Sequence, residues 1–317
     1  MEEGSPTAWP REPTGVKGVE AEMIQAERCE VSVVSGCNLS CRACQVLAPL
    51  AGAAAVRPEV VHEDLSLLAR HYRAERVELR GGEPLLHPAL PEIAAAVRGS
   101  GVARRVRVVT NGLHLHRMEE RFWTAVDEVF VSAFPDVRLG ADELAACVRR
   151  AQAHGVGLSL RRFDHFRESY AGQSTANDEL VRRIFATCQF AHVRRCHSVR
   201  DGFFAKCRQC HAIAESAGTT RDGVRIHAGD SLGEELRAHL ADRYPMRSCR
   251  RCLGSAGKRF PHREVEARTW RSVHETCVDH VLDEAHLARL ESDPLAPGGC
   301  LAAEEVLAGP FTAAPRA

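Results

Sequence analysis

Three closely spaced cysteines have the clearest chemical potential in this chain. Cys37, Cys41 and Cys44 form a C-x3-C-x2-C motif directly after the apolar segment 29–34. Four thiolates complete a cubane iron–sulfur cluster, so a set of three leaves one iron open to a small-molecule ligand. A zinc site would need a fourth Cys or His nearby, and residues 45–50 contain neither. The spacing therefore favours an open 4Fe-4S site over zinc or disulfide bonds.

The motif resembles the signature of the radical S-adenosylmethionine (SAM) enzymes. In that family the amino and carboxylate groups of SAM chelate the open iron. An electron from the cluster cleaves SAM to methionine and a 5′-deoxyadenosyl radical, which abstracts a hydrogen from the substrate. The resemblance covers roughly residues 29–163. It departs from the family at Ala43, where an aromatic residue usually lies beside the adenine, so that contact must come from elsewhere.

Two further segments resemble family features in the right order. The first is Gly81-Gly82-Glu83-Pro84, which resembles the GGEP segment whose backbone and carboxylate hold the methionine amino group. The second is Thr110-Asn111-Gly112, which resembles a T-N-G turn of the family. The resemblance therefore implies SAM as a cofactor, with Gly81, Gly82, Glu83, Pro84 and Asn111 among the residues that bind it.

Strand-like and helix-like segments alternate between residues 29 and 161. The pattern predicts strands at 29–35, 76–80, 105–109, 128–133 and 156–161, and helices near 62–73, 88–99, 117–126 and 141–154. Successive β-α units form a parallel sheet, and ligands bind at the carboxyl ends of its strands, where all three motifs fall. The chain is thus expected to be α/β. The resemblance implies a partial (β/α)6 barrel, although the sixth strand cannot be placed.

Two polar residues on the later strands are further candidates for the same rim. Ser132 lies on the fourth expected strand and Arg161 ends the fifth. They are candidates for contacts to the SAM ribose and carboxylate. The alternative for each is an ordinary surface or core polar residue.

A second group of cysteines follows in the C-terminal half. Its members are Cys188, Cys196, Cys207, Cys210, Cys249 and Cys252. Asp201-Gly202 lies between two short strand-like segments and predicts a hairpin. The spacing of Cys188, Gly202 and Cys207 resembles the start of the SPASM and twitch auxiliary-cluster domains. The closing C-x2-C, Cys249 and Cys252, fits the shorter twitch version. The resemblance implies one auxiliary 4Fe-4S cluster, and a zinc site is the alternative.

Six thiols are available for four ligand places. We assign Cys188, Cys196, Cys207 and Cys252 as ligands, and a second possible set replaces Cys196 with Cys249. In the first set Cys249 is left as a free thiol beside the active site, where it could return a hydrogen atom to the substrate.

Changes in composition suggest four regions. Residues 1–26 are expected to be a flexible arm, 27–175 the barrel core, 176–292 a small C-terminal iron–sulfur (twitch-like) domain and 293–317 a flexible tail. Within the third region helices are expected near 176–187, 232–241 and 276–291.

The overall composition excludes several function classes. Basic and acidic residues number 42 each, which gives no case for binding to nucleic acid or to a membrane surface. No apolar segment approaches the length of a membrane span. The 13 cysteines are therefore expected in a reducing cytoplasm, where cysteine clusters are typical of metal sites.

The resemblance implies hydrogen abstraction from a small-molecule substrate, with an electron donor such as flavodoxin or ferredoxin. We predict an epimerase that inverts a sugar carbon of an aminoglycoside-type antibiotic, with Cys249 as the catalytic hydrogen donor. The alternative is a twitch-type dehydrogenase that oxidises an aminocyclitol or sugar alcohol to a ketone. Peptide maturation is less favoured, because residues 1–28 are too short and too proline-rich for a peptide-binding region. A simple electron carrier would not need the GGEP segment.

Overall fold

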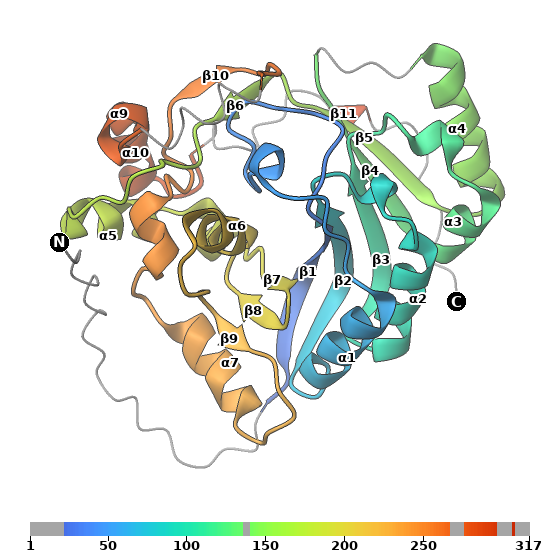
Figure 1. The fold of residues 1–317 in the computed structure, drawn as a ribbon, viewed down its shortest axis with the longest axis horizontal. Helices are drawn as coiled ribbons and strands as arrows, with labels where there is room; N and C mark the ends of the chain where they lie inside the picture. Colours follow the sequence, from blue (N-terminus) through green and yellow to red (C-terminus); the bar gives the residue numbers. More distant parts are fainter. Residues whose placement is uncertain (1–21, 136–139, 267–275, 297–305, 308–317) are drawn as a thin grey trace.

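The fold is described by a computed structural model for residues 22–135, 140–266, 276–296 and 306–307. It is a mixed α/β partial barrel built on one curved sheet (Figure 1). The sheet order is β11-β5-β4-β3-β2-β1-β7-β8-β9, in which β11 (Val306–Leu307) pairs antiparallel with β5. Neighbours from β5 to β7 pair in parallel. The expected α/β class with a parallel sheet is confirmed.

The first five strands and four helices follow the expected alternation. The strands are β1 (Ile24–Val34), β2 (Tyr72–Gly81), β3 (Ala103–Thr110), β4 (Glu128–Ala133) and β5 (Gly157–Arg162), and the helices are α1 (Pro58–Leu68), α2 (Leu90–Ser100), α3 (Glu120–Ala125) and α4 (Ala141–Ala153). The helices cover the convex face of the sheet (Figure 1). Alternate residues of the strands, such as Val77, Leu79 and Val108, are fully buried against them.

Some boundaries differ from the expected ones. Pro58 at the first turn starts α1 four residues earlier than predicted, and Tyr72 already belongs to β2, where it pairs with Ile24 of β1. Residues 24–26 are therefore strand rather than flexible arm. The rest of the expected arm, residues 1–21, lies outside the described residues, as does most of the expected tail.

The expected helix 276–291 is two helices. These are α9 (Val278–Val281) and α10 (Glu284–Ser292), and Asp283 caps the second by accepting a hydrogen bond from the His286 N–H at 3.0 Å. The helix predicted near 117–126 is shorter and follows a 3-10 turn, η3 (Leu115–Arg117).

The C-terminal half extends the sheet from its β1 edge. Its strands are β7 (Ser198–Arg200), β8 (Phe203–Ala205) and β9 (Val224–Arg225). The first two form the expected hairpin, with φ of 50° at Asp201 and 75° at Gly202. Because β7 pairs in parallel with β1, it is the sixth parallel strand among the described residues, on the opposite edge from β5.

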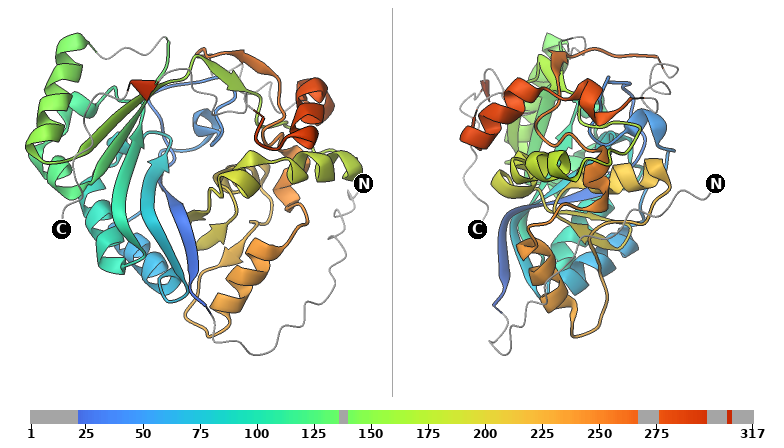
Figure 2. Two further views of the ribbon diagram at one scale, coloured as in Figure 1. Left: turned by 180° about the vertical axis from the view of Figure 1, so that it is seen from behind. Right: turned by 90° about the vertical axis from the view of Figure 1, so that its left-hand side faces the viewer.

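Helices and short turns of this half lie across the concave side of the sheet (Figures 1 and 2). They include α5 (Asp178–Ala186), η4 (Gln189–Val193), α6 (Arg208–Ala217) and η5 (Arg247–Arg251). Helix α7 (Leu232–Ala241) instead packs through Leu232 and Leu236 into the same core cluster as α1. A two-stranded ribbon of β6 (His165–Arg167) and β10 (Arg259–Pro261) closes one end. A separate apolar cluster joins α5 to α9 and α10. Within the described residues, no helix combines the length and apolar character needed to cross a bilayer.

Charged side chains line the concave face of the sheet. Glu78 on β2 is 1% exposed and lies 2.7 Å from Arg80, 3.3 Å from Arg76 and 3.4 Å from Arg107. Burial alone would raise the pKa of Glu78, but the surrounding arginines outweigh it and lower the pKa to about 2. The interior of the arc is therefore a polar space.

Replacing Glu78 by Gln should lower the free energy of unfolding by about 3–5 kcal/mol at neutral pH, because buried arginines lose their counter-charge. Chemical denaturation would measure this. The pKa of Glu78 is depressed in the folded state, so its contribution is present above about pH 4.5 and is lost as the pH falls towards 2.

The matched control is Glu92→Gln, which breaks an exposed pair with Arg121 and should change stability by no more than about 0.5 kcal/mol. Equal effects of the two substitutions would show that the buried network does not stabilise the sheet.

Candidate active site

The loop that carries the first three cysteines is held by the end of β2. The Gly82 N–H donates to the Val34 carbonyl at 2.8 Å, and the Glu83 N–H donates to the Gly36 carbonyl at 2.9 Å. A Cβ on Gly82 would lie 2.1 Å from the Gly36 carbonyl oxygen. Glycine is thus required here because two backbones approach closely, which is a role in the fold besides any contact with SAM.

Glu83 joins the ends of β2 and β3. Its carboxylate is 1% exposed and accepts hydrogen bonds from the Thr110 hydroxyl at 2.6 Å, the Asn111 N–H at 2.8 Å and the Leu85 N–H at 3.0 Å. Burial raises its pKa, with these donors acting in the opposite direction. A carboxylate has about four acceptor positions, so one remains for a further donor.

Asn111 and Pro84 complete this junction. The Asn111 side-chain amide donates to Asn38 Oδ1 at 2.7 Å, which ties the end of β3 to the cysteine loop. Pro84 is buried and opens a 3-10 turn, η2 (Pro84–Leu86). All five expected residues of this junction therefore lie beside the cysteine loop.

The three thiols share one environment. Cys37, Cys41 and Cys44 belong to an apolar cluster whose other members are Leu39, Leu113, Phe134 and Phe166. Burial raises the pKa of Cys37 to about 12, and the pKa of Cys41 is raised by burial and by the two neighbouring thiols. The Leu39 N–H donates to Cys37 Sγ at 3.4 Å. An anionic sulfur there gains from such a donor, so the loop fits a cluster that takes three thiolates.

His262 is a neighbour that the sequence did not single out. Its Nε2 lies 3.2 Å from Cys41 Sγ, and its ring stacks on Phe134 at 4.6 Å between centroids. It comes from the segment after β10, more than 200 residues along the chain, so no local pattern indicates it.

Ser132 and Arg161 are direct partners in the pairing of β4 with β5. Both are half-buried at the carboxyl ends of their strands. They lie near one another on the rim, and their contacts with SAM stay a prediction.

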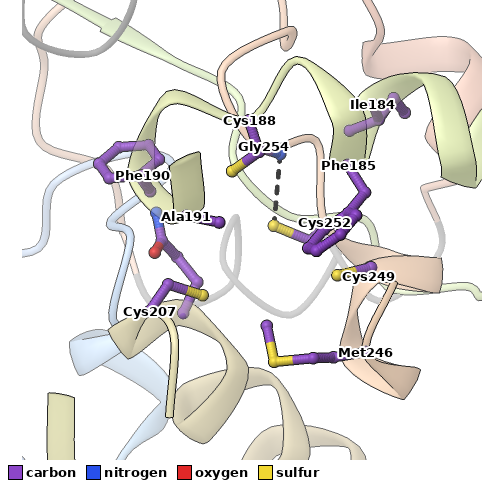
Figure 3. A pocket seen from close by; sticks show the side chains of 11 residues that line it. Ile184, Phe185, Cys188, Phe190, Ala191, Cys207, Met246, Cys249, Cys252 and Gly254 are labelled. Carbon is purple, nitrogen blue, oxygen red and sulfur yellow. Dashed lines mark hydrogen bonds between the residues drawn. The ribbon is translucent and has the colours of Figure 1, made fainter. Parts of the chain in front are cut away.

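Four thiols of the second group line one pocket (Figure 3). They are Cys188 after α5, Cys207 before α6, Cys249 on η5 and Cys252 after η5. We call this the thiol pocket. The remaining wall is largely apolar and includes Phe185, Phe190, Met246, Gln209 and Gly254.

Close backbone contacts shape the thiol pocket. The Gly254 N–H donates to Cys252 Sγ at 3.3 Å, and a Cβ on Gly254 would lie 3.3 Å from Cys188 Sγ. Gly254 also has φ of 51°, in the left-handed region that favours glycine. An N–H donor to sulfur and this close fit around two thiols suit a site for a thiolate-bound group.

The thiols influence one another electrostatically. The pKa of Cys249 is raised by burial and then by the nearby sulfurs of Cys252, Cys207 and Cys188. The pKa of Cys207 is instead lowered, because Cys210 donates to it. Fully ionised together, these four sulfurs would repel one another, which a bound cation or cluster relieves.

Cys196 and Cys210 do not line the thiol pocket. Both belong to an adjacent apolar cluster with Cys188 and Cys207. Cys210 donates to the Cys207 carbonyl at 2.9 Å. The lining of the thiol pocket thus contains the second set considered above, with Cys249, whereas Cys196 of the assigned set packs beside Cys188 and Cys207 outside it. Both ligand sets stay predictions.

The geometry also bears on the zinc alternative. Among the described residues, no three His, Cys, Asp or Glu side chains converge closely enough to hold a single metal ion. Zinc needs four ligands within about 2.3 Å of one point, whereas a cubane binds each thiolate to a different iron. The described side chains therefore form no preorganised single-ion site, and zinc stays the alternative to a cluster in the thiol pocket.

Gly82→Ala should displace the cysteine loop, since its Cβ would overlap the Gly36 carbonyl oxygen. We expect the variant to lose about four irons after anaerobic reconstitution, measured as iron and sulfide per chain. Gly52→Ala is the control, because a Cβ there meets nothing within 4 Å. Full iron content in folded Gly82→Ala protein would contradict this account of the loop.

Comparisons with known proteins agree with the first half of the site. The sequence model of the Radical SAM superfamily matches residues 31–134. GTP 3′,8-cyclase of Klebsiella pneumoniae is 34% identical over 95 residues, which are 29% of this chain and 29% of that protein. The Chlorobaculum tepidum cyclase is 30% identical over 138 residues, 42% of this chain and 39% of that protein. The chain thus spans well under half of each of these relatives.

Solved structures are similar only at a low level. BtrN in complex with AdoMet and 2-DOIA has a TM-score of 0.38 and 16% identity, covering 70% of this chain and 83% of that chain. SuiB of Streptococcus suis bound to S-adenosylmethionine has a TM-score of 0.34 and 9% identity, covering 67% and 68%. TM-scores this low support no assignment of function.

The superfamily match contains the three-cysteine motif, the GGEP segment and the T-N-G turn, which the structure brings together at one rim of the sheet. Residues 31–134 are therefore similar to the Radical SAM superfamily in both their sequence match and the placement of these motifs.

Proposed function

We propose that this chain is a radical SAM dehydrogenase that oxidises an aminocyclitol or sugar alcohol to a ketone. The observation that carries this proposal is the convergence of Cys188, Cys207, Cys249 and Cys252 on the thiol pocket. Four thiols supply every ligand of an auxiliary 4Fe-4S cluster. Cys249 then has no free thiol to return to a substrate radical, and this favours oxidation over inversion.

The first site prepares the hydrogen abstraction. Cys37, Cys41 and Cys44 would hold the SAM-binding cluster, and Glu83 has one acceptor position for the methionine amino group. When bound, the cluster and SAM supply a 5′-deoxyadenosyl radical. The chain contributes the placement of the thiols, the buried carboxylate and the apolar shield of Leu113, Phe134 and Phe166.

Oxidation of an alcohol requires an acceptor for one electron. The carbon loses a hydrogen atom to the 5′-deoxyadenosyl radical, and the resulting radical then loses the hydroxyl proton and one electron to become a ketone. The four thiols of the thiol pocket would hold a second cluster, which would supply the electron acceptor that this balance requires, and the proton would leave to solvent. An external donor such as flavodoxin or ferredoxin supplies the electron that cleaves SAM.

The rim carboxylates are less suited to hold an amine. Asp164 is 2.6 Å from Arg162, Asp201 is 2.8 Å from Arg221, and Glu168 pairs with Arg42. Each of them already has an arginine within hydrogen-bond distance, so each has less acceptor capacity left for an amine.

A radical SAM epimerase acting on an aminoglycoside-type antibiotic is the second candidate. The pKa of Cys249 lies well above its usual value, so the metal-free thiol stays protonated, as a hydrogen donor must. This function needs Cys196 as the fourth ligand, and Cys196 does not line the thiol pocket.

Iron analysis separates the two ligand sets. Cys249→Ala should reduce the iron content by up to about four per chain after anaerobic reconstitution, whereas Cys196→Ala should keep it. The Cys37→Ala/Cys41→Ala/Cys44→Ala triple variant should lose the other cluster and all formation of 5′-deoxyadenosine. Loss of iron in Cys196→Ala but not in Cys249→Ala would restore the epimerase ligand set.

Product analysis separates the two reactions. With SAM, reductant and an aminocyclitol or aminoglycoside, the dehydrogenase yields a product lighter by two hydrogens and no deuterium from heavy water at the oxidised carbon. The epimerase yields a product with one deuterium at the inverted carbon, because thiols exchange with solvent. Mass spectrometry distinguishes these outcomes, and a deuterated epimer would refute the dehydrogenase.

A further inference from the structure

The pairing of β1 with β7 brings buried polar side chains to a second pocket. Glu30 and Ser198 are direct register partners, so their side chains lie beside each other on one face of the sheet. Both line this pocket, and His211 of α6 lines it from the opposite wall. We call it the polar pocket.

The polar pocket lies between the two sets of thiols. Val46, two residues after Cys44, and Gly81, the first residue of the GGEP segment, form part of its wall. On the other side α6 begins directly after Cys207, so the same helix borders both pockets. A substrate within reach of both clusters would therefore lie at or beside the polar pocket.

Three polar atoms in this pocket lack hydrogen-bond partners. They are Glu30 Oε2, Ser198 Oγ and His211 Nδ1, on residues that are 4%, 2% and 1% exposed. Buried polar atoms are nearly always paired, and exceptions at a cavity wall point to a ligand or an ordered water. Three such atoms, from the neighbouring strands β1 and β7 and from α6 facing them, make a built polar site.

The unpaired atoms define which chemistry the pocket accepts. His211 Nε2 lies 3.4 Å from the Ser198 carbonyl, which only accepts, so this nitrogen carries the proton. Burial lowers the pKa of His211 to about 4, so the ring is neutral and its Nδ1 is an acceptor. Glu30 Oε2 is also an acceptor, and the Ser198 hydroxyl both donates and accepts. A ligand here must mainly donate.

The nearby arginines do not make this an anion site. Arg80 lies 3.4 Å from Glu30 Oε1 and 2.7 Å from Glu78. Arg208 donates to Gln45 Oε1 at 2.7 Å, and its Nε lies 3.7 Å from Glu30 Oε2, an ion pair beyond hydrogen-bond distance. Arg200 pairs with Glu215. Each cation already has an acceptor, so a hydroxyl or ammonium group fits better than a phosphate or carboxylate.

We infer that the polar pocket is the subsite that holds one amino or hydroxyl substituent of an amino-polyol substrate, through Glu30, Ser198 and His211. The pocket is narrow, so it receives a substituent rather than a whole ring. The inference rests on the proposed function, because it names the substrate group recognised between the two clusters.

Calorimetric titration of the reconstituted, SAM-bound enzyme tests the inference. The probes are 2-deoxystreptamine, myo-inositol as a polyol without amines and myo-inositol 1-phosphate as an anion. We expect 2-deoxystreptamine to bind most tightly and Ser198→Ala to weaken it about five-fold through one lost hydrogen bond. His211→Phe should have a similar effect. Ser66→Ala on the outer helix α1 is the matched control and should bind like the unaltered enzyme.

Several results would overturn the inference. In calorimetry, these are unaltered binding by both folded pocket variants, tightest binding of myo-inositol 1-phosphate, or no binding of 2-deoxystreptamine by the unaltered enzyme. A crystal structure of the complex with only an ordered water beside Ser198 would also overturn it. Products are assayed in the same samples. Normal oxidation with unaltered binding by the variants refutes the subsite alone, whereas 5′-deoxyadenosine without an oxidised product refutes the proposed function.

Discussion

The close approach of two strand ends determines where the chemistry of this protein takes place. The backbone at Gly82 lies against residues 34–36, with no room for a Cβ, so the loop after β1 and the turn after β2 have one relative position. Glu83 then connects this turn to the end of β3 through the Thr110 hydroxyl and the Asn111 N–H. Leaving a buried carboxylate without its three donors would be costly, so Glu83 holds the ends of β2 and β3 in one relative position. The position of the three thiols follows from backbone contacts, not from the thiols themselves.

The second half of the chain depends on the same strand. Because β7 pairs with β1, the hairpin and α6 have a fixed position relative to the cysteine loop. Helix α6 carries Cys207 at its start and His211 one turn later, so it presents a thiol to one pocket and an imidazole to the other. The segment from β7 to β9 is thus an extension of the barrel sheet. The boundary predicted at residue 175 stays a prediction.

The first site could be predicted from the sequence because its signals are local: a cysteine spacing, two glycines and a turn, each at the end of an apolar strand. The hairpin at Asp201 was equally clear, since its turn type needs positive φ at two successive residues. The choice between Cys196 and Cys249 could not be made this way. Cys249 reaches the thiol pocket because Asp222 accepts hydrogen bonds from the N–H groups of Arg247 and Ser248 at 3.1 and 2.8 Å, and no spacing rule describes that contact. Glu30 was missed because a charged residue in a strand usually indicates a solvated face.

The position of Cys249 says more about its role, ligand or hydrogen donor, than its pKa does. A raised pKa describes the metal-free thiol, and coordination deprotonates a thiol outright, so the same sulfur could be a hydrogen donor before a cluster is bound and a ligand afterwards. Cys196 has a different environment: burial and then the Glu30 carboxylate raise its pKa, and Arg80 and Arg208 oppose them. Cys196 thus has charged residues of the polar pocket nearby, but it is buried and lines neither pocket, so its position favours neither a ligand of the auxiliary cluster nor a donor to substrate.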